Sequence, residues 1–238
     1  MKIPAAEVDN SWGWSPIGRL VSSVKGIRSI RIEETVTKYR FNKGLIAKDS
    51  GNVYRALYYF KKVLRFNKRS VDLLNNIGVC YFEICQYRKA YMYFKRAAST
   101  AEDPEIILNV MAAALKVGKK SQLCNCYQKL LCQVITEPEI LLQAASLLSQ
   151  AGYLNLGIDM YNYYESIGHH KMKAVRGRGI CLAKQGKLAE AEACAEILLD
   201  STEYKKEGWE LKGYILDIQN RYKEAVDCYN KAYGFVKS

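Results

Sequence analysis

Apolar residues recur every three or four positions along most of the chain, which is the spacing of one face of an α-helix. The stretch from Leu73 to Ala98 shows this pattern most clearly and predicts two short amphipathic helices folded back on each other. Gly78 lies midway along the first helix, where a close neighbour would leave no space for a side chain. One face of the second helix carries Tyr87, Ala90, Phe94 and Ala97. The stretch therefore predicts a tightly packed helical hairpin.

The same features return at a fixed period. Gly44 and Gly78 are 34 residues apart, and Ala145, Gly179 and Gly213 follow one another at the same interval. Gly78 and Ala145 are 67 residues apart, one short of two periods. This interval predicts that a third repeat, near Ala112, has lost a residue at its inter-helix turn around Gly118.

The second helix of each hairpin keeps the same period. Its small or apolar marker falls at Ala56, Ala90, Leu123, Gly157, Ala191 and Ala225. An aromatic residue follows four positions later, except at Ala195, and is expected to fill the space towards the next pair: Phe60, Phe94, Tyr127, Tyr161 and Tyr229. One helix pair cannot bury its own apolar face, whereas stacked pairs can. The spacing thus predicts six helix-turn-helix repeats over 37–70, 71–104, 105–137, 138–171, 172–205 and 206–238.

Over roughly 200 residues this set of small and aromatic positions resembles the tetratricopeptide repeat (TPR) superfamily. The resemblance implies an all-α, right-handed superhelical solenoid without enzymatic activity or cofactor. It also implies a concave groove, lined by the first helix of each repeat, that binds peptides or proteins. Lys173 and Arg176 are expected to face this groove, as are Asn75 and Asn109, which either bind an extended peptide backbone or are simply solvated.

Residues 1–36 lie outside the repeats. Ser15 and Pro16 predict a helix start, and a stripe of apolar residues from Ile17 to Ile27 follows at helical spacing. This helix either caps the open end of the solenoid or lies on a membrane surface or a partner. The segment has no hydrophobic core typical of a secretory signal, and no apolar run reaches the roughly 18 residues of a membrane span. These features predict a cytoplasmic protein.

Positive charge is concentrated in the first repeat. The formal net charge is +12, and residues 37–70 supply nine of those charges because their only acidic residue is Asp49. The ten cations are Lys38, Arg40, Lys43, Lys48, Arg55, Lys61, Lys62, Arg65, Lys68 and Arg69. We expect this patch to attract an anionic partner, the alternative being a solvated face that only aids solubility. A smaller cluster falls in repeat five: Lys171, Lys173, Arg176, Arg178 and Lys184.

The chain shows no motif of an enzyme or a metal site. Its two histidines, His169 and His170, are adjacent, whereas a metal-binding pair on a helix is spaced i, i+4. The eight cysteines include no C-x-x-C pair, and most fall where a repeat needs a small apolar side chain. We expect them to be free packing thiols.

Both ends of the array carry aromatic residues suited to self-association. In repeat six the candidates are Tyr229, Tyr233 and Phe235, and before the array they are Trp12 and Trp14. Contact between the two unlike ends of neighbouring copies would be heterologous and would give rings or filaments. The alternative is a monomer in which these side chains fold back.

Residues 38–51, KYRFNKGLIAKDSG, also resemble the start of the array in magnetosome-associated TPR proteins. That likeness implies a self-assembling scaffold attached peripherally to the cytosolic face of an organelle membrane. Two other functions are considered: a secretion-type chaperone that holds a client segment in the groove, and a nucleic-acid binder acting through repeat one. The positive charge disfavours the chaperone, and the absence of RNA-binding motifs makes nucleic acid an unlikely partner.

Overall fold

The computed structural model describes residues 34–133, 135, 137–168 and 171–235, and every regular element in these ranges is an α-helix. The expectations for Trp12, Trp14 and the stripe from Ile17 to Ile27 fall outside the described residues, as do those for His169 and His170. Among the described helices, none combines the length and the apolar character needed to cross a membrane.

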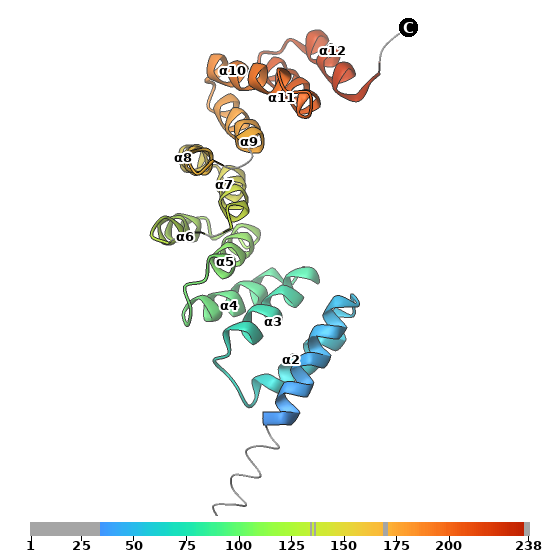
Figure 1. The fold of residues 1–238 in the computed structure, drawn as a ribbon, viewed down its shortest axis with the longest axis vertical. Coiled ribbons are helices and arrows are strands. Elements are labelled where there is room, and N and C mark those ends of the chain that lie inside the picture. The colour runs from blue at the N-terminus through green and yellow to red at the C-terminus, as the bar shows by residue number, and fades with distance from the viewer. Residues whose placement is uncertain (1–33, 134, 136, 169–170, 236–238) are drawn as a thin grey trace, which may run out of the picture.

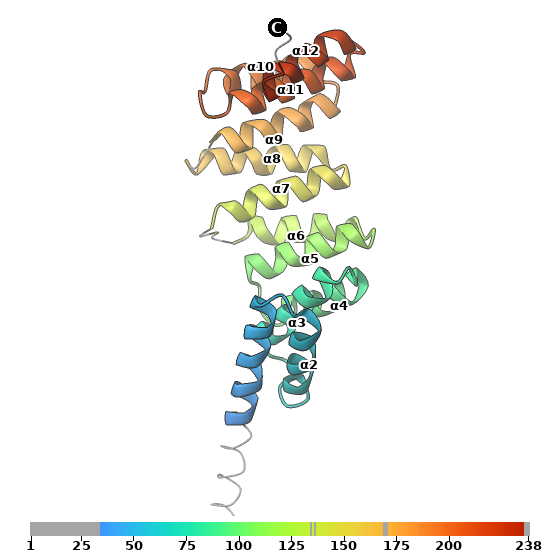
Figure 2. The same cartoon turned by 90° about the vertical axis from the view of Figure 1, so that its right-hand side faces the viewer.

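The helices form six consecutive antiparallel pairs (Figures 1 and 2). A helix whose described part spans residues 34–49 pairs with α2 (Val53–Leu64). The next five pairs are α3 (Val71–Glu83) with α4 (Tyr87–Ala98), α5 (Pro104–Lys116) with α6 (Ser121–Leu131), α7 (Glu139–Ala151) with α8 (Leu154–Ser166), α9 (Lys171–Lys184) with α10 (Leu188–Leu199), and α11 (Lys205–Ile218) with α12 (Tyr222–Tyr233).

The pairs stack into a curved rod. In Figure 1 the second helices α6 and α8 lie on the outer side of the curve, while α5 and α7 lie on its inner side. Figure 2 looks onto the inner side and shows α5, α7 and α9 crossing it as successive rungs. The predicted all-α helical solenoid is confirmed.

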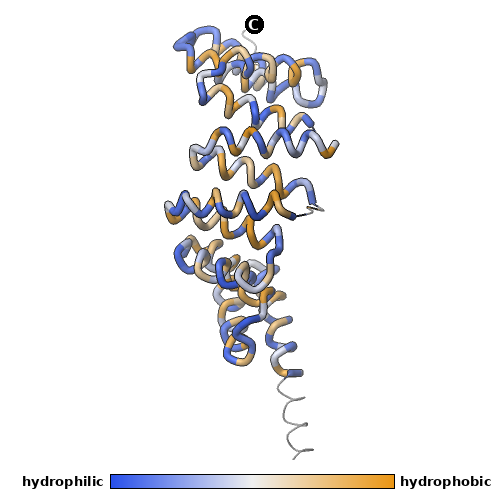
Figure 3. The backbone as a smooth tube through the Cα atoms, turned by 90° about the vertical axis from the view of Figure 1, so that its left-hand side faces the viewer, coloured by the Kyte–Doolittle hydropathy of each residue, from blue (hydrophilic) through white to orange (hydrophobic). Residues whose placement is uncertain are grey.

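Helix starts follow local sequence signals. Ser70 caps α3 by accepting a hydrogen bond from the Leu73 amide, and Asp103 caps α5 in the same way through the Glu105 amide. Pro104 then occupies the first turn of α5, where its missing amide hydrogen costs no hydrogen bond. Hydrophobic and hydrophilic segments follow one another along each helix (Figure 3), and the core is formed by buried hydrophobic side chains from every helix pair.

The predicted tight contacts at Gly78 and Gly213 are confirmed. A Cβ atom at Gly78 would lie 2.5 Å from the ring of Phe94, and one at Gly213 would lie 2.7 Å from the ring of Tyr229. In these repeats the aromatic ring packs on the glycine of its own helix pair, and the ring of Phe94 also lines the space towards α5 of the next pair, as expected. In repeat four the ring likewise reaches the next pair, where that of Tyr161 covers Gly177.

The turn between the two helices of each pair fixes the register of the repeats. One residue with positive φ closes each turn, and successive ones are 34, 33, 34, 34 and 34 positions apart: Gly51, Cys85, Gly118, Gly152, Gly186 and Asn220. The short interval ends at Gly118, so the residue missing from repeat three lies before its turn.

The missing residue lies in the connector that precedes α5. The second-helix markers Ala90 and Leu123 are also 33 positions apart, so the shift arises after Ala90. Met111, not Ala112, therefore occupies the place held by Gly78 one repeat earlier. The expected loss at the turn around Gly118 is wrong because helix spacing alone cannot separate a shorter connector from a shorter turn.

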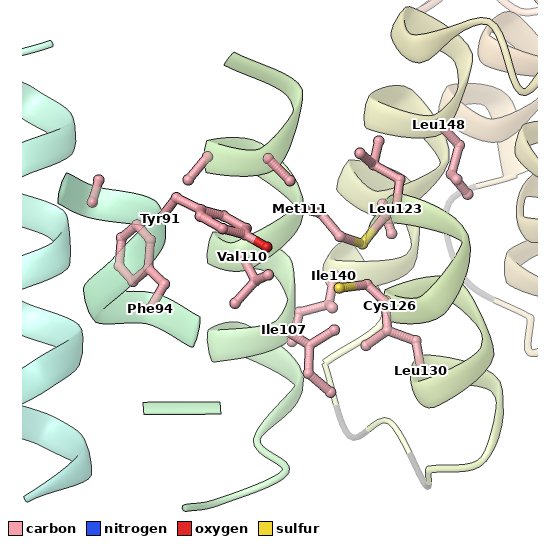
Figure 4. Packing of buried hydrophobic residues seen from close by; sticks show 14 of the residues in the cluster. Tyr91, Phe94, Ile107, Val110, Met111, Leu123, Cys126, Leu130, Ile140 and Leu148 are labelled. Atoms are coloured by element: carbon pink, nitrogen blue, oxygen red, sulfur yellow. The ribbon is translucent and has the colours of Figure 1, made fainter. Parts of the chain in front are cut away.

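At the centre of repeat three, Met111 takes the place of the glycine that an aromatic ring covers in repeats such as the second. It is fully buried and points towards Leu123 and Cys126 of α6 (Figure 4). The core is continuous across this irregular repeat, because one cluster of buried side chains extends from Ala47 to Cys181. The solenoid thus remains a single stacked array.

Candidate interaction surfaces

Side chains of successive first helices meet along the groove. Asn109 donates a hydrogen bond from its amide nitrogen to the Asn75 side-chain oxygen at 3.1 Å, and Lys48 donates one to Asn76 at 2.8 Å. Asn75 and Asn109 are only half-buried, so each keeps some capacity to bind a further polar group. The two predicted groove asparagines are therefore partners of each other across one period.

Farther along, the groove is crossed by ion pairs. Lys173 lies 3.5 Å from Glu139 of the preceding first helix, and Arg176 lies 2.9 Å from Glu210 of the following one. Both pairs again span 34 residues. Tyr233 of α12 donates a hydrogen bond to Glu210 at 2.9 Å, so this carboxylate is held from two sides.

Two hollows lie between first helices in the groove. The first, of about 250 Å³, opens between α3 and α5 and is lined by Val79, Phe82, Glu83, Phe94, Asn109 and Ala112. The second, of about 340 Å³, opens between α9 and α11 and is lined by Arg176, Ile180, Lys184, Glu210, Leu211 and Tyr214. Each has an apolar floor with polar groups at its rim, which suits a side chain of an extended peptide.

The repeat-five basic cluster is largely neutralised. Besides Lys173 and Arg176, the half-buried Arg178 lies 2.9 Å from Glu165 of α8. An ion pair cancels much of the field of its cation, so these groups offer little to an outside anion. The sequence indicated a second positive cluster in repeat five, but ion pairs with glutamates neutralise most of its cations.

The repeat-one patch has a different character. Among the described residues from 34 to 101, none takes part in an ion pair, whereas seven pairs join residues from Glu102 onward. Among the described residues, nine of the ten predicted patch cations contact no carboxylate or side-chain amide, the exception being Lys48. The charge of repeat one is thus uncompensated within this part of the chain.

Several of these cations lie over tyrosine rings instead. The ammonium group of Lys62 is 4.3 Å from the ring centre of Tyr58, and that of Lys43 is 5.6 Å from Tyr39. Lys61 and Lys89 both lie over Tyr81, at 5.3 and 5.4 Å. A cation over an aromatic face is attracted to the ring and keeps its positive charge. The hydrogen bond from Lys62 also lowers the pKa of the Tyr58 hydroxyl.

The contribution of repeat two to the positive surface of repeat one was not predicted from the sequence. The ring of Tyr81 stacks on that of Tyr93 at 5.5 Å, and Arg96 lies 5.6 Å from the Tyr93 ring centre. Arg96 also donates a hydrogen bond to the Lys68 carbonyl at 3.2 Å, which ties repeat two to the connector of repeat one. The available signal was the absence of any acidic residue in α4.

The two ends of the array expose large apolar side chains. Of the 16 exposed large hydrophobic residues in the described part of the chain, five lie in repeat one and five in repeat six. Val226 is 54% exposed, although it occupies the position at which Leu57 and Tyr91 are buried in earlier repeats. Tyr233 and Phe235 are exposed as well, with their ring centres 6.4 Å apart.

Tyr229 does not belong to this exposed end. Its ring covers Gly213 and its hydroxyl donates a hydrogen bond to Asp217 at 2.7 Å. Burial, together with that bond to a carboxylate, raises the pKa of the Tyr229 hydroxyl. The structure therefore places this predicted self-assembly residue inside the last helix pair.

Most thiols occupy packing positions. Cys80, Cys126 and Cys181 are buried, and burial raises the pKa of Cys80 and of Cys126 to about 11. Cys85 and Cys132 are exposed. No group of three histidine, cysteine or acidic side chains close enough to bind a metal occurs among the described residues.

Comparisons with known proteins identify the repeat type. A family model described as "Tetratricopeptide repeat" matches residues 207–235, and no curated protein sequence matches the chain. A tetratricopeptide repeat protein from Parabacteroides merdae is 16% identical, with a TM-score of 0.73 over 85% of this chain and 80% of that one.

Two further structures share the fold. MamA is 18% identical, with a TM-score of 0.58 over 78% of this chain and 94% of its own. YrrB, described as a TPR protein with an unusual peptide-binding site, is 14% identical, with a TM-score of 0.52 over 73% and 90%. The resemblance of the sequence to the TPR superfamily is confirmed: the chain has the tetratricopeptide-repeat fold, and its sixth repeat also matches the sequence model of that family.

Proposed function

We propose that the chain is a non-enzymatic scaffold that holds an extended segment of a partner protein in its concave groove. The observation that supports this most is the pair of hollows between first helices, each with an apolar floor and polar rim groups. Asn75 and Asn109 between them offer amide groups to a peptide backbone. The peptide-binding site in the name of YrrB, which shares the fold, is consistent with this use of a TPR surface.

Site-specific photo-crosslinking in the native cell tests the groove. A crosslinking amino acid replaces Val79 or Ala112 in the first hollow, or Ala189 or Ala193 on the exposed side of α10 as matched controls. We expect the same partner to be captured from both groove positions and from neither control. Equal capture from α10, or no capture from the groove, would overturn the proposal.

We also propose that copies associate end to end. The supporting observation is the concentration of exposed apolar side chains at repeat one and repeat six, because such patches mark interaction surfaces. On the repeat-six side the contributing residues are Val226, Tyr233 and Phe235. Unlike ends that meet in this way produce rings or filaments.

Light scattering over a range of concentrations tests association. We expect a mass that rises with concentration for the intact chain and falls to that of a monomer in V226D/F235S. The control is I197D, which places a charge at an exposed apolar residue of repeat five, outside both terminal repeats. A constant monomer mass for the intact chain would exclude assembly.

The uncompensated cations of repeat one form a third element of the proposal, a surface for an anionic partner. The likeness of residues 38–51 to magnetosome-associated TPR proteins implies that such a surface could be a magnetosome membrane. The charge itself supports only the broader class, an anionic surface of any source.

A further inference from the structure

The exposed faces of α2 and α4 contain cations and apolar side chains but no acid. On α2 the exposed stripe consists of Tyr54, Arg55, Tyr58, Lys61 and, at the helix end, Arg65. On α4 it consists of Arg88, Lys89, Met92, Lys95 and Arg96. Neither helix contains an aspartate or glutamate. Each stripe repeats every three or four residues, so its members share one face of the helix.

The sign of this charge changes along the array. α2 and α4 are the second helices of their pairs, as α8 and α10 are, and the latter two contain acids but no lysine or arginine. The acids of α10 already have partners: Glu190 lies 3.9 Å from Lys187, Glu196 lies 2.7 Å from Lys212, and Glu192 accepts a hydrogen bond from Gln219. In a second copy of the chain, the acids of α10 would therefore not be free to pair with the cations of α2 and α4.

The cations of α2 and α4, by contrast, are not neutralised by ion pairs with acidic side chains of the described residues. The Tyr81–Tyr93 ring stack lies beneath Lys61, Lys89 and Arg96, which come from both helices. The aromatic faces fix the positions of these three cations without neutralising them. Because the side chains are already ordered, binding an anion costs less side-chain conformational entropy.

The apolar residues of the stripes indicate the kind of anion. Tyr54, Tyr58 and Met92 are 72, 55 and 61% exposed and lie between the cations. Tyrosine rings favour the headgroup level of a bilayer, and alternation of basic and apolar side chains is typical of interfacial segments. A nucleic acid would satisfy the charge but gives no reason for an exposed methionine.

We propose that the outer faces of α2 and α4 dock on an anionic phospholipid bilayer. Lys61, Lys62, Lys89 and Lys95 contact the headgroups, and the three apolar side chains enter the headgroup layer. α2 and α4 are second helices of their pairs, whereas the groove is lined by first helices, so docking through α2 and α4 leaves the groove free. This rests on the anionic-surface part of the proposed function and names its partner and its residues.

Vesicle sedimentation tests this docking. The probe is a vesicle of phosphatidylcholine and phosphatidylglycerol (3:1), with phosphatidylcholine alone as the neutral reference. Each Lys or Arg near an anionic surface raises partitioning about fivefold, so K61Q/K62Q/K89Q/K95Q should bind at least ~100-fold more weakly. The charge-matched control, K120Q/K171Q/K205Q/K223Q, removes four exposed lysines that have no ion pair and should stay within about threefold of the wild type.

A second variant separates bilayer insertion from charge attraction alone. Y54S/Y58S/M92S keeps every cation and should bind anionic vesicles several-fold more weakly, with the difference persisting in high salt, because screening does not weaken apolar contacts. Far-ultraviolet circular dichroism shows that each variant is folded. Equal losses in the two lysine variants, or no loss in the apolar variant, would overturn the proposal.

Two further outcomes also count against it. Wild-type protein that ignores anionic vesicles but binds single-stranded RNA through the same lysines would make the surface a nucleic-acid site. Failure to bind vesicles while the groove still captures its partner would reject this inference and leave the groove function intact.

Discussion

The first two repeats and the last two repeats share their internal packing but differ in how they handle charge. Gly78 receives the ring of Phe94 in the same way as Gly213 receives that of Tyr229. Outside that core, the described cations of repeats one and two form no ion pair and several lie over tyrosine rings, whereas Arg176, Arg178 and Lys212 contact glutamates. The repeat pattern therefore determines the buried packing positions, whereas the charges and contacts of surface side chains differ between repeats.

This difference shows that a basic cluster in the sequence is not yet a positive surface. Lys173, Arg176 and Arg178 fall within six consecutive residues. Their acids come from other helices, at Glu139, Glu210 and Glu165. The acids of α3, Asp72 and Glu83, form no ion pair with the cations of α2 and α4, so this cluster remains available to an anion.

The largest effect is expected from the packing that both regions share. Gly78→Leu or Gly213→Leu forces a side chain into the Phe94 or Tyr229 ring and should lower the free energy of unfolding by about 1–3 kcal/mol, as overpacked cores do. Denaturant unfolding measures it. The control is G118N, at a turn with open space and a positive φ that asparagine tolerates. Leucine at either glycine without loss of stability would show that the rings do not lie where the structure places them.

A smaller effect should separate the two regions. Arg178→Gln leaves the half-buried Glu165 carboxylate without its ion-pair partner and should cost about 1–2 kcal/mol. Lys95→Gln removes an exposed cation without a carboxylate partner and should change stability by less than about 0.5 kcal/mol. Thermal melts of both variants compare them directly. Equal costs would mean that the charges of the two regions are compensated alike.

Alkaline pH should weaken the core in both regions without distinguishing their surfaces. Burial raises the pKa of Cys80 in repeat two to about 11, and it also raises the pKa of Cys181 in repeat five and of Cys228 in repeat six. Between the two regions, burial raises the pKa of Cys126 to about 11 and that of Tyr161 to about 12. In the unfolded chain these groups lose their protons at lower pH, so their contribution is complete below about pH 8.5 and declines as pH rises towards 11–12. Melting temperatures at pH 7.5 and pH 10.5 test this. A chain equally stable at both values would contradict the burial of these groups.

Much of the fold could be predicted from spacing. The period of 34 residues placed Gly78 and Gly213 in tight contacts, because a repeat that stacks on itself must reuse the same packing positions. The register of Met111 could not be found in the same way. One residue removed from a connector shifts every later position equally, so spacing shows that a loss occurred and not where.

The candidate surfaces were less predictable because they depend on contacts between helices. Glu139 and Lys173, like Arg176 and Glu210, stand one period apart, and opposite charges at that interval are a signal that the sequence does contain. The Tyr81 contacts with Lys61 and Lys89 have no such regular interval. Tyr229 was misplaced because helical periodicity could not show that its ring covers Gly213 of its own pair.

The central claim is that the positive surface of this solenoid lies on repeats one and two. Cation-exchange retention of two charge-matched variants tests it most directly. K61Q/K62Q/K89Q/K95Q removes four lysines without a carboxylate partner, whereas K129Q/K173Q/R176Q/K212Q removes four cations that contact glutamates. We predict that the first variant elutes at clearly lower salt than the wild type and that the second elutes close to it. Equal shifts of the two variants would show that retention follows net charge alone and would contradict the account.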